Sequence, residues 1–223
     1  MSIYTETAWP IMDTAAVSAL QNLSGAGPLL LNGTLANAST PSQISFIAAN
    51  FTRSISLTSV NNIAGVTFVI SGFQNGAFVT ESIAGPNNNT VFGAKYYDYI
   101  TSVVANGSVT GISAGTGNAG YLPIISVNTN NIGGNVNYSC SVLLPGGSGI
   151  TYTLVQTLET ITTNFIAFQN QIGKFFPIPG FTGWTGATTS QIGNSTTITN
   201  FILLEVTSSM PVTDTFNFIF LQE

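Results

Sequence analysis

The chain has 223 residues, of which 3 are Lys or Arg, 8 are Asp or Glu and none is His. Asn, Ser and Thr supply 22, 22 and 30 residues, so the chain is polar without being charged. With Arg53, Lys95 and Lys174 as its cations and a net charge of −5, it cannot neutralise the phosphates of DNA or RNA, and nucleic acid is excluded as a partner. Its hydrophobic fraction of 44% is enough for a sizeable core and excludes a wholly disordered chain.

The first 27 residues read as an N-terminal arm. Asp13 could cap one or two helical turns before Gly25, but no longer period follows. The stretch has no basic segment and already contains Glu6, so no secretory signal is expected. No apolar run reaches the roughly 18 residues of a membrane-spanning helix, and we expect no membrane partner.

Residues 28–118 have a hydrophobic period of two, which is typical of half-buried strands. Ile55 and Leu57 alternate with serines, and Val66, Phe68 and Ile70 share one face. Segments rich in Gly and Asn separate these strands, and each predicts a tight hairpin. They are residues 61–65, 73–76, 85–89 and the pair Asn106-Gly107.

The second half, residues 119–223, repeats the strand pattern, but the turn residues between its strands are less distinct. Strands are predicted at 135–144, 150–158, 201–208 and 214–222. Apolar residues spaced by 3, 4, 3 and 4 from Leu158 to Ile172 indicate one helical face. Residues 173–196 have Gly, Pro and aromatic residues without a period, and we interpret them as a long contact loop.

Strands of this spacing, separated by Gly and Asn turns, predict an all-β fold with antiparallel β-sandwich architecture. The Gly-rich residues near 116–121 suggest a boundary between two tandem sandwich units, 28–118 and 119–223. One continuous jelly-roll-like sandwich is the alternative.

The residues of catalysis are missing or scattered. Without His, neither a Ser-His-Asp nor a Cys-His arrangement is possible, and no zinc or calcium motif is present. The carboxylates Glu81, Asp98, Glu159 and Glu205 have no spacing that pairs them, and we expect solvated or turn-anchoring roles. We therefore predict no catalytic residue, no cofactor and no metal, and hence no enzyme.

Two further motifs have structural interpretations. GTGNAG at residues 115–120 matches GxGxxG, but Pro123 and β-branched residues follow where a dinucleotide site needs a helix, so a turn is predicted. Cys140 alternates with Val136, Tyr138 and Val142, which predicts a small buried core residue and not a nucleophile.

The low charge content also means that few charged side chains are available for the protein surface. Soluble monomers keep strand edges apart with Lys and Glu, which this chain almost lacks. We therefore expect its surface to be covered by copies of itself in a homo-oligomer, with a trimer as the preferred state. Aromatic residues of the arm and the long loop are the candidate interface residues, namely Trp9, Phe175, Phe176, Phe181 and Trp184.

The middle of the chain carries a series of short patterns along residues 54–117. They are Thr58-Ser59 followed by GVTF at 65–68, Gly72 and Gly76, Glu81 ahead of Gly85-Pro86-Asn87, Thr90-Val91, and Thr101-Ser102-Val103 before a glycine. Together they resemble a β-rich module of tailed-bacteriophage virion proteins. The resemblance covers about 65 residues, implies a role in virion structure and supplies no catalytic residue.

From this resemblance we expect a non-enzymatic protein of a phage particle, made in the host cytoplasm and located in the virion. A capsid decoration or cement protein that contacts the major capsid protein or other virion proteins is the first hypothesis. A tail, adaptor or fibre component is the second. A glycan-binding module for host attachment is the rival from another class, with Trp184, Phe181 and Tyr residues stacking on sugar faces and Asn side chains bonding sugar hydroxyls.

Overall fold

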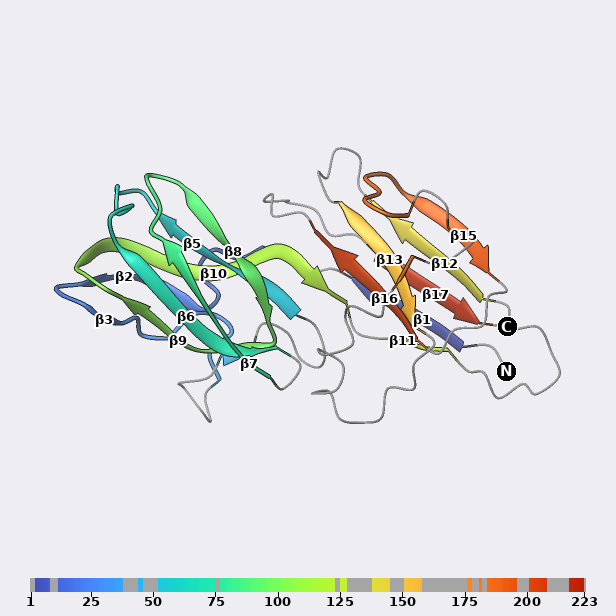
Figure 1. Cartoon of the computed structure of the whole chain (residues 1–223), viewed down its shortest axis with the longest axis horizontal. Coiled ribbons are helices and arrows are strands. Elements are labelled where there is room, and N and C mark those ends of the chain that lie inside the picture. The colour runs from blue at the N-terminus through green and yellow to red at the C-terminus, as the bar shows by residue number, and fades with distance from the viewer. Residues whose placement is uncertain are drawn as a thin grey trace. The chain divides into compact units, whose positions relative to one another are not determined.

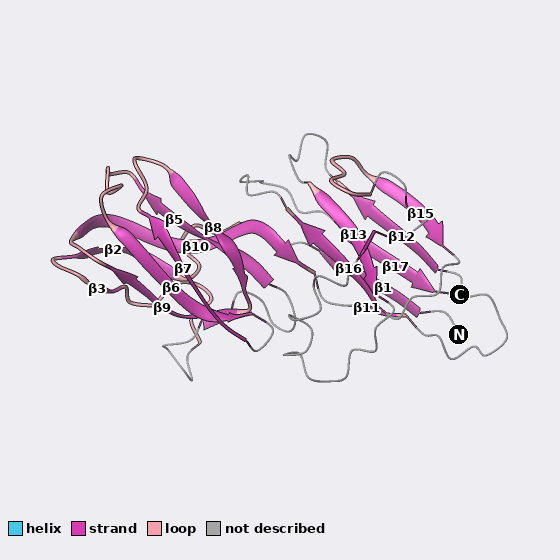
Figure 2. Ribbon diagram, in the orientation of Figure 1, coloured by secondary structure: helices cyan, strands magenta, loops and turns pink. Residues whose placement is uncertain are grey.

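The structure is a computed structural model, and its described residues contain strands, turns and loops but no helix (Figure 2). They are residues 3–8, 12–37, 44–45, 52–74, 77–122, 125–127, 138–144, 151–157, 176–177, 181, 184–195, 201–207 and 217–222. The chain is an all-β protein with antiparallel sheets in sandwich architecture, as predicted. No helix in this part of the chain is long and apolar enough to cross a membrane.

The chain forms two compact units. Residues Met12–Gly120 form one, which we call the central unit. Residues Met1–Ile11 and Tyr121–Glu223 form the other, the terminal unit. The division at Gly120 lies two residues from the boundary predicted from the sequence, but the range predicted as an N-terminal arm is split between the two units.

Two antiparallel sheets make up the central unit (Figure 1). In the first, β10 pairs with β2 and with β5, and β5 pairs with β8. In the second, β9 pairs with β3, β4 and β6, and β6 pairs with β7. The bounds are β2 (Ser18–Leu23), β3 (Gly27–Pro28), β4 (Ile44–Ser45), β5 (Thr52–Ser59), β6 (Thr67–Gln74), β7 (Ala77–Ala84), β8 (Thr90–Tyr97), β9 (Tyr99–Ala105) and β10 (Val109–Tyr121).

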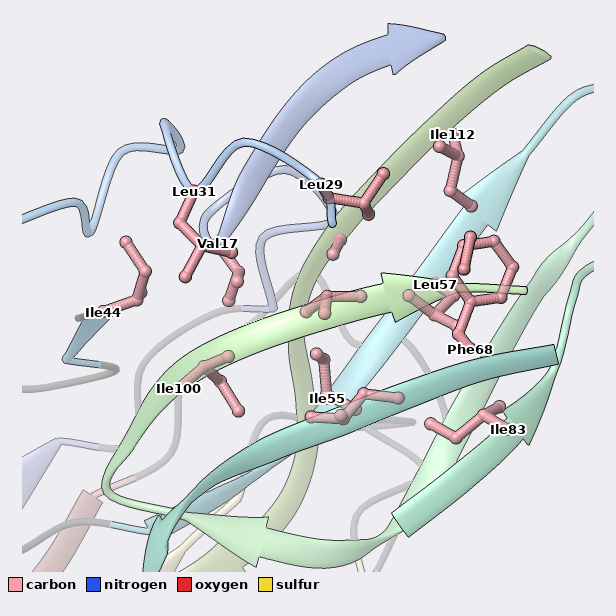
Figure 3. Packing of buried hydrophobic residues seen from close by; sticks show 14 of the residues in the cluster. Val17, Leu29, Leu31, Ile44, Ile55, Leu57, Phe68, Ile83, Ile100 and Ile112 are labelled. Atoms are coloured by element: carbon pink, nitrogen blue, oxygen red, sulfur yellow. The ribbon is translucent and has the colours of Figure 1, made fainter. Parts of the chain in front are cut away.

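A core of aliphatic residues with one Phe and one Tyr joins these two sheets (Figure 3). Ile55 and Leu57 of β5 contribute from the first sheet, and Phe68 of β6 and Ile100 of β9 from the second. All four side chains are fully buried. The period of two seen in the sequence therefore places one face of each sheet in this core.

Three of the four predicted hairpins are instead connections between the two sheets. Residues 61–65 join β5 to β6, residues 85–89 join β7 to β8, and Asn106-Gly107 lies between β9 and β10, and in each case the two strands belong to different sheets. Only β6 and β7, joined by residues 75–76, form the predicted hairpin. Gly107 does not adopt a positive φ. A tight turn would leave the next strand in the same sheet, whereas this core has to be covered from the opposite side.

The terminal unit also has two sheets. In one, β17 pairs with β1 and β12, and β12 pairs with β15; in the other, β13 pairs with β14 and β16, and β16 pairs with β11. The bounds are β1 (Ile3–Ala8), β11 (Ile125–Ser126), β12 (Tyr138–Leu143), β13 (Tyr152–Thr157), β14 (Phe176–Pro177), β15 (Gln191–Ser195), β16 (Phe201–Val206) and β17 (Asn217–Gln222).

Two sequence-based predictions are changed by this unit. The supposed N-terminal arm contributes a full strand, because β1 pairs along its whole length with β17 near the other end of the chain. The supposed contact loop 173–196 contains β14 and β15, both paired within the unit. The helical face predicted for residues 158–172 lies outside the described residues.

Candidate interaction face

A buried arginine links two strands of the central unit. Arg53 on β5 is 1% exposed, and its Nε donates a hydrogen bond of 2.7 Å to the carbonyl oxygen of Gly117 on β10. Its Nη2 donates to the same oxygen. Burial lowers the pKa of Arg53 to about 10, an effect that the negative charge of Asp13 opposes. The guanidinium is therefore enclosed in the fold, where it cannot receive a ligand from solvent.

The segment of the GxGxxG match lies in a strand and does not form the predicted turn. A Cβ atom at Gly115 would lie 1.9 Å from the backbone oxygen of Asp13, and one at Gly117 would lie 2.3 Å from Oγ of Ser54. Both positions lie inside β10. Glycine is required there because neighbouring segments approach the strand closely, and not because a ligand binds.

A carboxylate ties the edges of the two sheets together. Oε2 of Glu81, on β7, accepts hydrogen bonds from the backbone N–H groups of Ala94 and Lys95 on β8, at 2.9 and 3.3 Å. Its Oε1 accepts from the hydroxyl of Tyr97 at 3.0 Å. Burial, with the nearby Glu81 charge, raises the pKa of Tyr97. In return, Nζ of Lys95 donates to the carbonyl of Thr80 on β7. Glu81 is thus a structural anchor.

Side-chain amides perform the same task at the opposite edge. Gln21 on β2 donates from Nε2 to the Leu30 carbonyl and accepts the Leu30 N–H at Oε1, each at 3.0 Å. Oδ1 of Asn32 accepts the N–H of Ala19 at 3.0 Å. Further Asn side chains bond backbone groups in the same way, namely Asn22, Asn61, Asn62, Asn89 and Asn106. Neutral amides therefore protect backbone groups where other proteins use charge.

The candidate thiol and carboxylate side chains in the described part of the chain form no metal-ligating cluster. Cys140 is buried with Tyr138 and Val142 on one face of β12, as predicted, and its burial raises the thiol pKa. Glu205 is half-buried on β16, where burial raises its pKa and a hydrogen bond with Tyr121 opposes the rise. Glu159 lies outside the described residues. Within the described ranges, no three metal-ligating side chains of the His, Cys, Asp and Glu types come together.

Two of the candidate interface residues belong to the core of the terminal unit. Phe181 is 4% exposed and Trp184 is 3% exposed. Their rings meet edge to face at 5.0 Å, and the series continues to Tyr138 on β12 and to Tyr152 on β13, at 6.1 and 6.0 Å. These aromatic residues join the two sheets, so the expectation of an exposed interface or a sugar platform at Phe181 and Trp184 is corrected.

The remaining candidates are Phe176, Trp9 and Phe175. Phe176 lies in the short strand β14, which pairs with β13. Trp9 and Phe175 lie outside the described residues.

An exposed face without charge lies on the second sheet of the central unit. We call it the open face; it consists of the outward residues of β9, β6 and β7. Cross-strand pairing arranges nine of them in three rows, and Thr67 and Ala84 form a further pair on the same face. The first is Val104, Val69 and Ser82, the second is Ser102, Ser71 and Thr80, and the third is Tyr99, Phe73 and Phe78.

Apolar side chains at both ends of the open face are accessible to solvent. Phe78 is 63% exposed, Val69 40% and Val104 37%. In the third row, the rings of Phe73 and Tyr99 stack at 5.1 Å, and Phe78 packs edge to face on Phe73 at 5.6 Å. None of the nine residues is Asp, Glu, Lys, Arg or His, so a partner can cover this face without removing a charged side chain from water.

Sequence reasoning missed the open face because it followed the buried alternation, Val66, Phe68 and Ile70, and not the residues between. A signal was present: no charged residue occurs between Arg53 and Glu81, a stretch that includes all of β6.

Comparisons of the chain with protein-family models, curated proteins and solved structures find no match. The residues that carry the phage-module resemblance, 54–117, all lie in the central unit.

Proposed function

We propose that this chain is a non-enzymatic structural component of a tailed-phage particle and, within it, a capsid decoration or cement protein. It would act as a homo-oligomer that contacts the major capsid protein and stabilises the shell. The observation that carries the proposal is the open face, an uncharged and partly apolar surface on a sandwich in which the charged groups of Arg53, Glu81 and Lys95 bond to backbone atoms of the same unit.

This arrangement suits a permanent contact between proteins. A cement protein needs a stable body and a surface that stays covered once the particle is built, and an uncharged face has no desolvation cost for ions. At the strand edges of the central unit, the side chains of Gln21 and Glu81 already hydrogen-bond backbone groups of the same chain. We therefore expect a neighbouring protein to contact a sheet face and not to add a strand to an edge.

The glycan-binding alternative has lost two of the aromatic residues on which it rested, because Phe181 and Trp184 are buried. The open face does have exposed aromatic residues. However, Phe73 and Tyr99 stack on each other, which occupies one face of each ring.

Particles that lack the protein provide the test. We expect them to release DNA at a lower temperature and at lower osmotic stress than complete particles, while still adsorbing to cells. Antibody labelling of complete particles should mark the shell. Normal shell stability with lost adsorption would replace the proposal by host attachment, and label confined to the tail would replace it by a tail, adaptor or fibre role.

A further inference from the structure

We infer that the fold makes Asn106 a site of spontaneous deamidation and protects Asn32 from the same reaction. The inference goes beyond the proposed function and does not depend on it. Three Asn-Gly pairs occur in the chain, and the structure describes two of them, Asn32-Gly33 and Asn106-Gly107, whereas residues 75–76 lie outside the described residues. A glycine after asparagine leaves the next backbone nitrogen unshielded by a side chain, and this nitrogen is the nucleophile of deamidation.

The reaction needs no partner except water. The backbone nitrogen of Gly107 attacks Cγ of Asn106 and gives up its proton to solvent base, while the side-chain nitrogen of Asn106 takes up a proton and leaves as ammonia. The product is a cyclic succinimide that joins the two residues. Water then adds to one of the two ring carbonyls and opens the ring, which leaves aspartate or isoaspartate at this position. Overall, an amide and a water molecule give a carboxylic acid and ammonia.

The asparagine side chains of the two pairs are held alike. Oδ1 of Asn106 accepts a hydrogen bond from the backbone N–H of Thr67 at 2.9 Å, and Oδ1 of Asn32 accepts one from the backbone N–H of Ala19 at 3.0 Å. Both asparagines are exposed. In each pair, the bonded N–H lies at the oxygen on which negative charge develops when Cγ is attacked. The electrophiles are therefore equivalent, and the difference between the two sites lies in the glycine.

The backbone nitrogen of the glycine is engaged at one site and available at the other. The N–H of Gly33 donates to the carbonyl of Val17 at 3.1 Å, and a Cβ atom at Gly33 would lie 2.1 Å from the backbone oxygen of Ala16. Ring closure at Gly33 would have to break this hydrogen bond and move the backbone against a neighbouring segment. Within the described part of the chain, the N–H of Gly107 donates no hydrogen bond. The nearest atom to a Cβ there would be Cγ2 of Val66, at 3.7 Å.

Deamidation of Asn106 changes the margin of the open face. The backbone N–H of Asn106 donates to the carbonyl of Thr67, an outward residue of that face, and its side chain accepts the Thr67 N–H. Either product puts a carboxylate beside Thr67 and makes the net charge of −5 more negative. Isoaspartate also adds a methylene group to the main chain between β9 and β10. A modified copy is therefore separable from an unmodified one by anion exchange.

Peptide mapping of the full chain tests the inference. The folded protein is incubated in mildly alkaline buffer, and conversion at Asn106 and at Asn32 is followed by mass spectrometry. We expect Asn106 to be converted about tenfold faster than Asn32, because the free energy of a hydrogen bond to the glycine nitrogen is added to the barrier at Asn32 alone. In urea the two rates should become similar. Equal rates in the folded protein, a faster rate at Asn32, or protection of both sites would overturn the inference.

A pair of glycine substitutions tests the nucleophile. Gly107→Ala places a methyl group beside the attacking nitrogen, in open space and without a positive φ, and should slow conversion of Asn106 by about tenfold. Gly65→Ala is the control, because a Cβ there meets nothing within 4 Å and no asparagine precedes it, and it should leave the rate at Asn106 unchanged. Circular dichroism checks that both variants fold. Unchanged conversion of Asn106 in Gly107→Ala, or aspartate formed without isoaspartate, would contradict the succinimide route and with it the inference.

Discussion

The two units of this chain build sandwiches from the same poorly charged composition, but they join their sheets differently. The central unit uses an aliphatic core and adds polar anchors at its margins, with Arg53 bonded to Gly117 and Glu81 bonded to β8. The terminal unit uses a series of aromatic rings, in which Phe181 and Trp184 connect Tyr138 to Tyr152. In the central unit, the charged side chains of Arg53 and Glu81 thus bond backbone groups. In the described part of the terminal unit, large aromatic rings fill the core instead.

The largest effect is expected from Trp184→Ala, which removes the ring between Phe181 and Tyr152. Loss of a buried Trp leaves a cavity, and we expect the terminal unit to lose about 3 to 5 kcal/mol. Urea unfolding followed by circular dichroism measures it. Ile192→Ala on β15, where the side chain is 76% exposed, is the control and should cost less than about 0.5 kcal/mol. Equal effects would mean that Trp184 does not hold the unit together.

Next comes Arg53→Ala, the corresponding change in the central unit. It leaves a cavity and takes two hydrogen bonds from the Gly117 carbonyl, and we expect a loss of about 3 kcal/mol. Both Trp residues belong to the sequence of the terminal unit, so Trp fluorescence should report a nearly unchanged transition there. Arg53→Met, which fills most of the space without a charge, should cost less than Arg53→Ala. The reverse order would show that the charge itself is essential.

The carboxylate anchor should matter somewhat less. Glu81→Ala leaves the N–H groups of Ala94 and Lys95 and the hydroxyl of Tyr97 without this acceptor. Because the two N–H groups can turn to water, we expect a loss of about 2 kcal/mol in the central unit. Glu81→Gln keeps one acceptor oxygen and should fall between wild type and Glu81→Ala. An unchanged midpoint of urea unfolding for both variants would exclude the anchoring role.

A smaller, pH-dependent effect is expected from Glu205 in the terminal unit. Burial raises the pKa of Glu205 in the folded protein, so the folded state binds its proton more tightly than the unfolded chain does. Stability from this group is therefore fully present below the ordinary carboxyl pKa of about 4.3 and falls as pH rises through the raised value. Glu205→Gln should remove this fall and stabilise the unit at neutral pH by less than about 1 kcal/mol. Urea midpoints of the two proteins at pH 4 and pH 7 measure it, and a variant less stable at pH 7 than wild type would contradict it.

The smallest effect concerns Cys140. The thiol is 1% exposed and burial raises its pKa, so it should not react with a thiol reagent in the folded protein. Labelling followed by mass spectrometry should show modification only after denaturant is added. Rapid labelling of the native protein would mean that β12 exposes the face assigned to the core.

Several features of the fold could be predicted from local patterns. Ile55 and Leu57 alternate with serines, and this period of two correctly identified β5 and its core face. The same argument correctly predicted that Cys140 is buried. Asn106-Gly107 shows the limit of local reasoning, because a short Asn-Gly segment can close a hairpin or cross to the facing sheet. The choice depends on which core has to be covered, and that information is not contained in the turn.

The sequence by itself determined the fold class of this protein: the period of two and the turns rich in Gly and Asn are properties of composition and order, and they imply β-sheets. The tertiary structure decided the rest. It paired Ile3–Ala8 with a strand near the end of the chain, placed Phe181 and Trp184 in a core, and left Val69 and Phe78 on an exposed face. These outcomes depend on contacts between residues far apart in the sequence, because a strand pattern shows that two faces differ but not which neighbour covers each of them.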